Sequence, residues 1–162
     1  MNENKITVGI SDARLSKNAG DVLVTYSLGS CIGVTLYDPV ARIGGMLHCM
    51  QPCSEDCRQS EEYSPFKFAD TGLASLYEKV LSTGAVARRL QVKIAGGAKR
   101  LSTINETFNI GKRNYVAVRK ALWKCALRVT AEEVGGTIPR TMYLNMENGA
   151  VMIGSQGTKR LL

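Results

Sequence analysis

The order of strand-like and helix-like segments is the feature that most constrains the fold of this 162-residue chain. Several short segments have the β-branched or alternating apolar character of strands, whereas two longer ones repeat apolar residues at helical spacing. The strand-like segments are residues 5–10, 21–26, 31–37, 42–50, 90–94, 127–134, 141–147 and 150–154. So many adjacent strands are incompatible with a doubly wound parallel sheet. We predict an α+β fold, an α/β sandwich of mixed or antiparallel sheets with two main helices.

Capping residues indicate where the two helices begin. Ser64 followed by Pro65 is typical of a helix start, and apolar residues then recur at helical spacing over residues 65–81. Asn109 is a candidate cap for the second helix, over residues 110–125. Both helices are amphipathic, so each is expected to cover one face of a sheet.

Length and composition favour a single domain over residues 1–162. The chain has 44% apolar and 22% charged residues, which is ordinary for a globular protein. Its apolar runs are too short for a membrane-spanning helix, so membrane insertion is not expected. The N-terminal residues lack the basic segment and apolar run of a secretory signal, which predicts a cytoplasmic location.

The net charge indicates which class of binding partner to expect, and the number of cysteines indicates whether they form disulfides. A net charge of +7 favours an acidic partner. The basic residues occur as scattered pairs without interleaved aromatic residues, so nucleic acid is not the expected partner. The number of cysteines is 5, which is odd, and thiols stay reduced in the cytoplasm, so free thiols are expected.

The stretch HCMQPCSEDC, residues 48–57, contains the one histidine of the chain. Two interpretations treat it as self-contained: a metal site, or a regulatory disulfide among Cys49, Cys53 and Cys57. Zinc sites usually have C-x2-C spacing, and adjacent residues on a strand point to opposite faces. Incidental free thiols are the third interpretation. From this spacing we do not predict a metal site.

A hairpin predicted over residues 31–37 and 42–50 would bring His48 close to a cysteine outside this stretch. If the hairpin turns between Pro39 and Val40, Cys31 lies directly opposite His48. Side chains opposed in this way have Cβ atoms about 4.5–5.5 Å apart on the same face. A neighbouring imidazole can stabilise a cysteine thiolate and later give a proton to a leaving group.

Three further residues suit such a site. Thr25 would orient the imidazole if its strand lies beside the hairpin. Gly29 and Ser30 precede Cys31, where a sharp turn can direct backbone N–H groups at a substrate oxygen. A lone histidine and a lone cysteine on strands are also common packing residues, so the pattern leaves catalysis and packing both open.

Six motifs together resemble one known family. They are TYSLGSC (25–31), HCMQP (48–52), FADT (68–71), KIAGGA (93–98), IGKRN (110–114) and GGTIPR (135–140). In this order they resemble the CheD family, the chemoreceptor glutamine deamidases of bacterial chemotaxis. The resemblance extends from about residue 22 to residue 149.

The resemblance implies an enzyme, a protein-glutamine glutaminase that converts receptor glutamine side chains to glutamate without a cofactor. Cys31 matches the nucleophile of the family, His48 its general base and acid, and Thr25 the residue that orients the histidine. The implied partners are the cytoplasmic helices of chemotaxis receptors and a CheC-type phosphatase. The alternative is an adaptor without activity that binds receptors or such a phosphatase.

Candidate substrate-binding residues come from the later motifs. The set consists of Gly96, Gly97, Lys99, Arg100, Arg113 and Asn114. Apolar residues usually follow GGA in the family, whereas Lys99 and Arg100 stand here, so the contacts to a receptor are expected to differ. Solvated surface charge is the alternative interpretation of these basic residues.

Overall fold

The computed structural model describes residues 3–55, 64–99 and 109–162. Two five-stranded sheets pack face to face, with strand orders β1-β3-β8-β9-β10 and β2-β5-β4-β6-β7. The first sheet contains β1 (Asn4–Thr7), β3 (Asp21–Leu28), β8 (Arg140–Asn145), β9 (Val151–Ser155) and β10 (Thr158–Leu161). The second contains β2 (Asp12–Ser16), β5 (Ile43–Cys49), β4 (Ile32–Asp38), β6 (Gln91–Gly96) and β7 (Val129–Val134).

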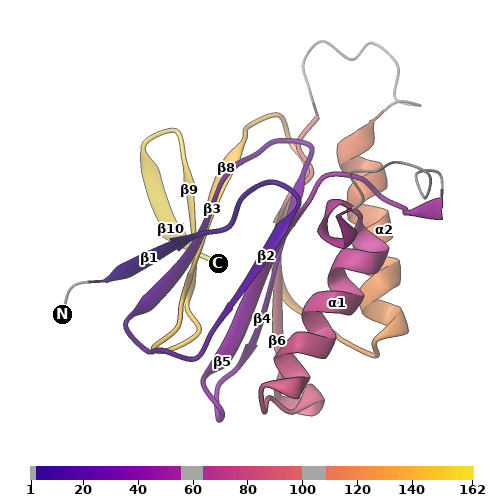
Figure 1. Cartoon of the computed structure of the whole chain (residues 1–162). Coiled ribbons are helices and arrows are strands. Elements are labelled where there is room, and N and C mark those ends of the chain that lie inside the picture. Colours follow the sequence, from indigo (N-terminus) through magenta and orange to yellow (C-terminus); the bar gives the residue numbers. More distant parts are fainter. Residues whose placement is uncertain (1–2, 56–63, 100–108) are drawn as a thin grey trace.

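Two helices, α1 (Ala69–Ser82) and α2 (Ile110–Lys124), cover the second sheet. Figure 1 shows that both lie on the face turned away from the first sheet, so the molecule has three layers. Two short 3-10 turns, η2 (Pro65–Lys67) and η3 (Ala87–Arg89), lead into α1 and β6. Both sheets contain parallel and antiparallel pairs. This architecture confirms the predicted α+β sandwich.

Burial follows from the three layers. Every residue of β4 and β5 is buried, because the second sheet lies between the first sheet and the helices. In contrast, β8 alternates between buried and half-buried residues, as a strand covered on one face should. One apolar core lies between the second sheet and the helices, and another lies between the two sheets.

The predicted start of the first helix is wrong, whereas the cap of the second is confirmed. Pro65 begins a 3-10 turn, and α1 starts only at Ala69. The Ser64 side chain makes no capping bond and instead donates to the carbonyl of Ser11, at 3.1 Å. For α2, the Asn109 side chain accepts a hydrogen bond from the backbone N–H of Lys112, at 3.1 Å.

Two strands were not predicted, β2 and β10. Each pairs on one side only, β2 with β5 and β10 with β9, at the edge of its sheet. Edge strands are often short and charged, and the sequences DARLS and TKRL lack the apolar pattern of a covered strand. Their pairing therefore depends on neighbours distant in sequence.

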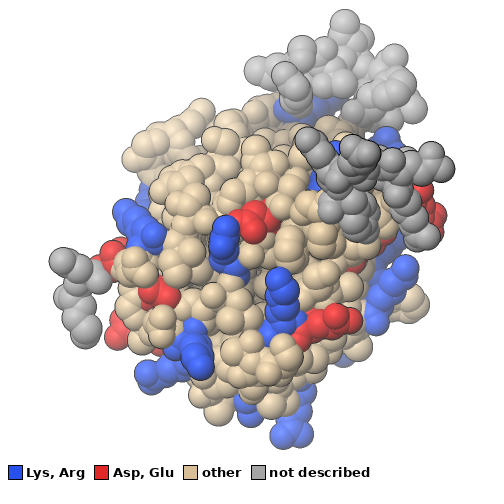
Figure 2. All heavy atoms as spheres, viewed as in Figure 1, with Lys and Arg blue, Asp and Glu red and all other residues tan. Residues whose placement is uncertain are grey.

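The surface carries its positive charge in a dispersed form. Figure 2 shows lysine and arginine side chains spread over the visible face, with a few acidic groups between them. In the part of the chain that the structure describes, no helix is long and apolar enough to cross a membrane.

Candidate active site

The register of the hairpin differs from the predicted one. Gly33, not Cys31, lies directly opposite His48, and Ile32 faces Cys49. The turn is longer than assumed, because the Asp38 carboxylate accepts hydrogen bonds from the backbone N–H groups of residues 40 and 41. The slip is two residues, and side chains on a strand repeat every two residues, so the face is preserved.

Cys31 directly precedes β4, and continuing this register places it diagonal to His48, on the side facing the first sheet. Residues two apart on one strand share a face, and diagonal pairs have Cα atoms about 7–8 Å apart. Cys31 is half-buried and contacts the core between the sheets, to which Gly33 also points. The glycine opposite His48 has no side chain to cover the ring.

The backbone around Cys31 is fixed where the chain crosses between the sheets. This crossover turn, residues 29–31, joins β3 to β4, and its three carbonyls all accept hydrogen bonds. The carbonyl of Gly29 accepts from Ala98 N at 2.7 Å, and that of Cys31 accepts from Gly97 N at 2.8 Å. The carbonyl of Ser30 accepts from Asn114 Nδ2 at 2.9 Å. The nucleophile candidate thus sits on a well-held turn.

His48 is held in one tautomer. Thr25 Oγ1 lies 2.7 Å from His48 Nδ1 and 2.8 Å from the carbonyl of Val8. A carbonyl only accepts, so the hydroxyl proton of Thr25 goes to Val8, and its oxygen accepts from Nδ1–H. Nε2 then carries a free lone pair. It is buried and has no hydrogen-bond partner among the described residues.

Thr25 reaches His48 by a route that differs from the one expected. Its strand, β3, belongs to the first sheet and faces β5 across the core instead of lying beside the hairpin. The carbonyl of Val8 completes the arrangement and was not predicted. No sequence signal could have found it, because every residue type has a backbone carbonyl.

Both ionisable groups favour their neutral forms. Burial lowers the pKa of His48 from 6.5 to about 4. Burial also raises the pKa of the Cys31 thiol, and this outweighs the opposite effect of its own backbone N–H. A resting thiolate stabilised by imidazolium, as the sequence suggested, does not fit these shifts. The shifts instead favour a neutral thiol and a neutral imidazole.

One backbone N–H group of the turn expected to face a substrate oxygen already has an acceptor within the chain. Gly29 N donates to the carbonyl of Ser27 at 2.8 Å, so it is not free for a substrate oxygen. Gly29 also supports the turn through its carbonyl, and the role of this turn as an oxyanion site stays a prediction. Ser27 has a positive φ of 57°, and the pairing of β3 with β8 shifts register there. Such an irregularity bends a strand, here just before the turn that carries Cys31.

The predicted substrate-binding residues separate into buried and exposed sets. Gly96 and Gly97 are buried and support the crossover turn. Asn114 is 0% exposed and donates to two backbone carbonyls, and its contact with substrate stays a prediction. Lys99 is half-buried and Arg113 is exposed. Arg100 lies outside the described residues.

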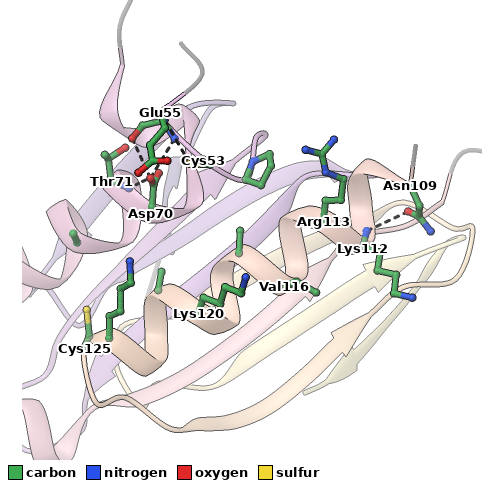
Figure 3. Close-up of a pocket in the computed structure, with 16 residues that line it drawn as sticks. Cys53, Glu55, Asp70, Thr71, Asn109, Lys112, Arg113, Val116, Lys120 and Cys125 are labelled. Atoms are coloured by element: carbon green, nitrogen blue, oxygen red, sulfur yellow. Dashed lines mark hydrogen bonds between the residues drawn. The ribbon is translucent and has the colours of Figure 1, made fainter. Parts of the chain in front are cut away.

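A groove of about 860 Å³ runs between α1 and α2, starting near the end of β5. Figure 3 shows Arg113, Val116 and Lys120 along α2, with Asp70 and Glu55 on the opposite side. The basic rim of the groove consists of Lys112, Arg113, Lys120 and Lys124. Cys31 and His48 do not line it.

The cysteine-rich stretch begins on β5, where neighbouring side chains point to opposite faces of the sheet. His48 faces Thr25 in the core between the sheets, whereas Cys49 is buried in the core below the helices. Cys53 is a free thiol on the groove, and Cys57 lies outside the described residues. Within residues 3–55, 64–99 and 109–162, no three His, Cys, Asp or Glu side chains are placed to hold a metal ion.

Comparison with known proteins agrees with the motifs. Residues 50–155 match the family model described as CheD chemotactic sensory transduction. The chain is 44% identical over 158 residues to a protein of Solibacter usitatus named probable chemoreceptor glutamine deamidase CheD. That match covers 98% of this chain and 93% of the relative. The chain belongs to the CheD family. A protein of Thermococcus kodakarensis, also named probable chemoreceptor glutamine deamidase CheD, is 40% identical over 91% of this chain and 90% of its own.

A solved structure supports the fold alone. The Bacillus licheniformis hypothetical protein YfiH superposes with a TM-score of 0.50 at 14% identity. The match covers 75% of this CheD-family chain and 49% of that protein.

Proposed function

We propose that residues 1–162 form a single deamidase domain that converts glutamine side chains of chemotaxis receptors to glutamate in the cytoplasm. Support comes from relatives named chemoreceptor glutamine deamidase that match nearly the whole chain. The observation that carries the proposal is the free Nε2 of His48, buried and oriented through Thr25 on the face that Cys31 shares. A packing histidine would normally have both ring nitrogens satisfied.

The reaction begins with a neutral pair. As Cys31 Sγ attacks the carboxamide carbon of glutamine, its proton passes to His48 Nε2. The imidazolium then gives that proton to the departing amine, so ammonia leaves and an acyl-thioester remains. Water attacks the thioester with His48 again accepting a proton. Return of that proton to sulfur releases glutamate and restores the thiol.

The negative oxygen of each tetrahedral intermediate needs hydrogen-bond donors. The backbone N–H groups of Ser30 and Cys31 are the candidates, since the N–H of Gly29 is used within the turn. Carbonyl bonds on all three turn residues keep these N–H groups in place before substrate binds. Such preorganised donors are typically the largest contribution to acyl-transfer catalysis.

Receptor recognition is proposed for the basic rim of the groove. Arg113 and Lys112 are exposed at the N-terminal end of α2, near the segment that follows His48. Receptor helices with acidic side chains beside the target glutamine would complement this rim. Lys99 lines a smaller cavity with Lys112 and Gly97 and is proposed to extend it. A CheC-type phosphatase is proposed as a competing partner.

The function is tested with purified receptor cytoplasmic fragments. Mass spectrometry of each glutamine-containing peptide follows conversion by the wild-type protein and by Cys31→Ala. We expect site-specific conversion by the wild type and none by the variant. Conversion by Cys31→Ala at the wild-type rate would overturn the proposed chemistry. Receptor binding by the wild type without any conversion would instead identify an adaptor.

A further inference from the structure

Asn114 connects the two halves of the candidate active site. This side chain lies on the inner face of α2 and is 0% exposed. Its Nδ2 donates to the carbonyl of Ser30 at 2.9 Å and to the carbonyl of Met50 at 3.0 Å. Ser30 directly precedes Cys31, and Met50 follows His48 by two residues. One amide group thus holds the backbone beside both reactive residues.

The orientation of this amide follows from its partners. Both N–H groups of Nδ2 are directed to carbonyl oxygens, and a flipped side chain would set Oδ1 against the same two acceptors. Oδ1 itself is buried and has no hydrogen-bond partner among the described residues. An unsatisfied buried acceptor costs about 1–3 kcal/mol. Asparagine at this position is therefore poorly explained by stability alone.

The sheet does not fix the separation that Asn114 controls. The pairing of β4 with β5 ends at Ile32 and Cys49, so Ser30 and Met50 lie just beyond the last paired residues. Beyond these residues no ladder bond joins the two strands to each other. The backbone of Cys31 is bonded instead to Gly97, and that of Met50 to Lys67. Asn114 replaces the missing ladder bonds by holding one carbonyl from each strand.

We propose that Asn114 is a positioning residue that sets the distance between Cys31 Sγ and His48 Nε2. The expected effect of Asn114 on deamidation rests on the proposed function. Its expected effect on how His48 influences the reactivity of the Cys31 thiol does not require a receptor. A displacement of about 1 Å in such a site can reduce the rate 100-fold.

The test compares Asn114→Ala and Asn114→Leu with Val118→Ala. Leucine fills the volume without a hydrogen-bond donor, which covers the case in which the alanine variant folds poorly. Val118 is 0% exposed on the same helix and belongs to the core between α2 and the second sheet, so its truncation weakens packing without touching the two carbonyls. Deamidation kcat and KM are measured for each variant. We expect kcat to fall about 100-fold for the Asn114 variants, with KM changed less than about threefold.

A second measurement keeps this inference separate from the proposed function. The rate of Cys31 alkylation by iodoacetamide is followed by peptide mass spectrometry from acidic to alkaline pH. The difference in rate between the wild type and His48→Ala is the part of the rate that depends on the imidazole. We expect the Asn114 variants to lose that part and Val118→Ala to keep it, even if no receptor glutamine is converted. Wild-type alkylation in both Asn114 variants, equal loss in Val118→Ala, or no effect of His48→Ala would overturn the proposal.

Discussion

At the scale of single residues, the proposed mechanism uses His48 as a base in its neutral form. The hydroxyl of Thr25 gives its proton to Val8, which leaves its oxygen to accept from Nδ1 and keeps the lone pair on Nε2. Burial keeps the ring neutral by lowering its pKa to about 4. In the proposed mechanism, the proton of Cys31 therefore moves during attack, and not before substrate binds.

The low pKa of His48 predicts a pH dependence of stability. The unfolded chain takes up a proton near pH 6.5, whereas the folded protein does so only near pH 4. As the pH falls through this window, the unfolded state gains protons first, and stability decreases by up to about 3 kcal/mol. Urea unfolding of the wild type and of His48→Gln at several pH values measures how the free energy of unfolding depends on pH. Carboxylates that titrate in both proteins cancel in the difference. Equal slopes for the two proteins would contradict the assignment.

Substitution of Thr25 tests how the ring is oriented. Thr25→Val keeps the shape but removes the oxygen that accepts from Nδ1, so kcat should fall about 100-fold or more. Thr25→Ser retains the hydroxyl and should stay within about fivefold of wild type in the same assay. A valine variant as active as the serine variant would show that the ring is held by packing alone.

At the scale of elements, the sequence predicts on which face of a strand a side chain lies better than it predicts which strands pair and in what register. The hairpin register was wrong by two residues because the Asp38 turn is longer than assumed, but an even slip left Cys31 and His48 on one face. The covered strands β4 and β5 were predictable from their apolar runs. The exposed edge strands β2 and β10 were not, since their pairing depends on distant segments.

The candidate site was only partly predictable for the same reason. Cys31, His48 and Thr25 carry distinctive side chains within motifs, and the fold brings Thr25 to His48 from the opposite sheet. The carbonyl of Val8 and the burial of Asn114 depend on tertiary packing, which no local pattern encodes.

The last residue of β6 offers a test at this scale. Gly96 has a φ of +112°, and a Cβ there would collide with the carbonyl oxygen of Cys31. Gly96→Ala should therefore lower the free energy of unfolding by about 2 kcal/mol and abolish deamidation. Gly20→Ala is the control, since a Cβ there meets nothing within 4 Å and should cost less than about 0.5 kcal/mol. Unfolding in urea and the receptor assay report both effects, and full activity of Gly96→Ala would contradict this role of the glycine.

At the scale of the whole molecule, the net charge of +7 bears on how a receptor is approached. The basic rim of the groove concentrates part of this charge along α2, whereas the face in Figure 2 has it dispersed. Attraction between exposed charges weakens as salt shortens the screening length.

Salt dependence tests whether the rim attracts the receptor. Between low and high salt, kcat/KM of the wild type should fall about fivefold, mainly through KM. A Lys112→Ala and Arg113→Ala double variant should begin with a lower kcat/KM and respond less to salt. A double variant with the wild-type salt response would place the receptor on another surface.

The central claim is that the sulfur of Cys31 bonds to the receptor glutamine. Its most direct test is an acid-quenched reaction of protein and receptor fragment, digested and analysed by mass spectrometry for a thioester between the two. We predict a link from Cys31 to the glutamine that later appears as glutamate, absent from Cys31→Ala. Conversion of that glutamine without any link to Cys31, or undiminished conversion by Cys31→Ala, would contradict the account.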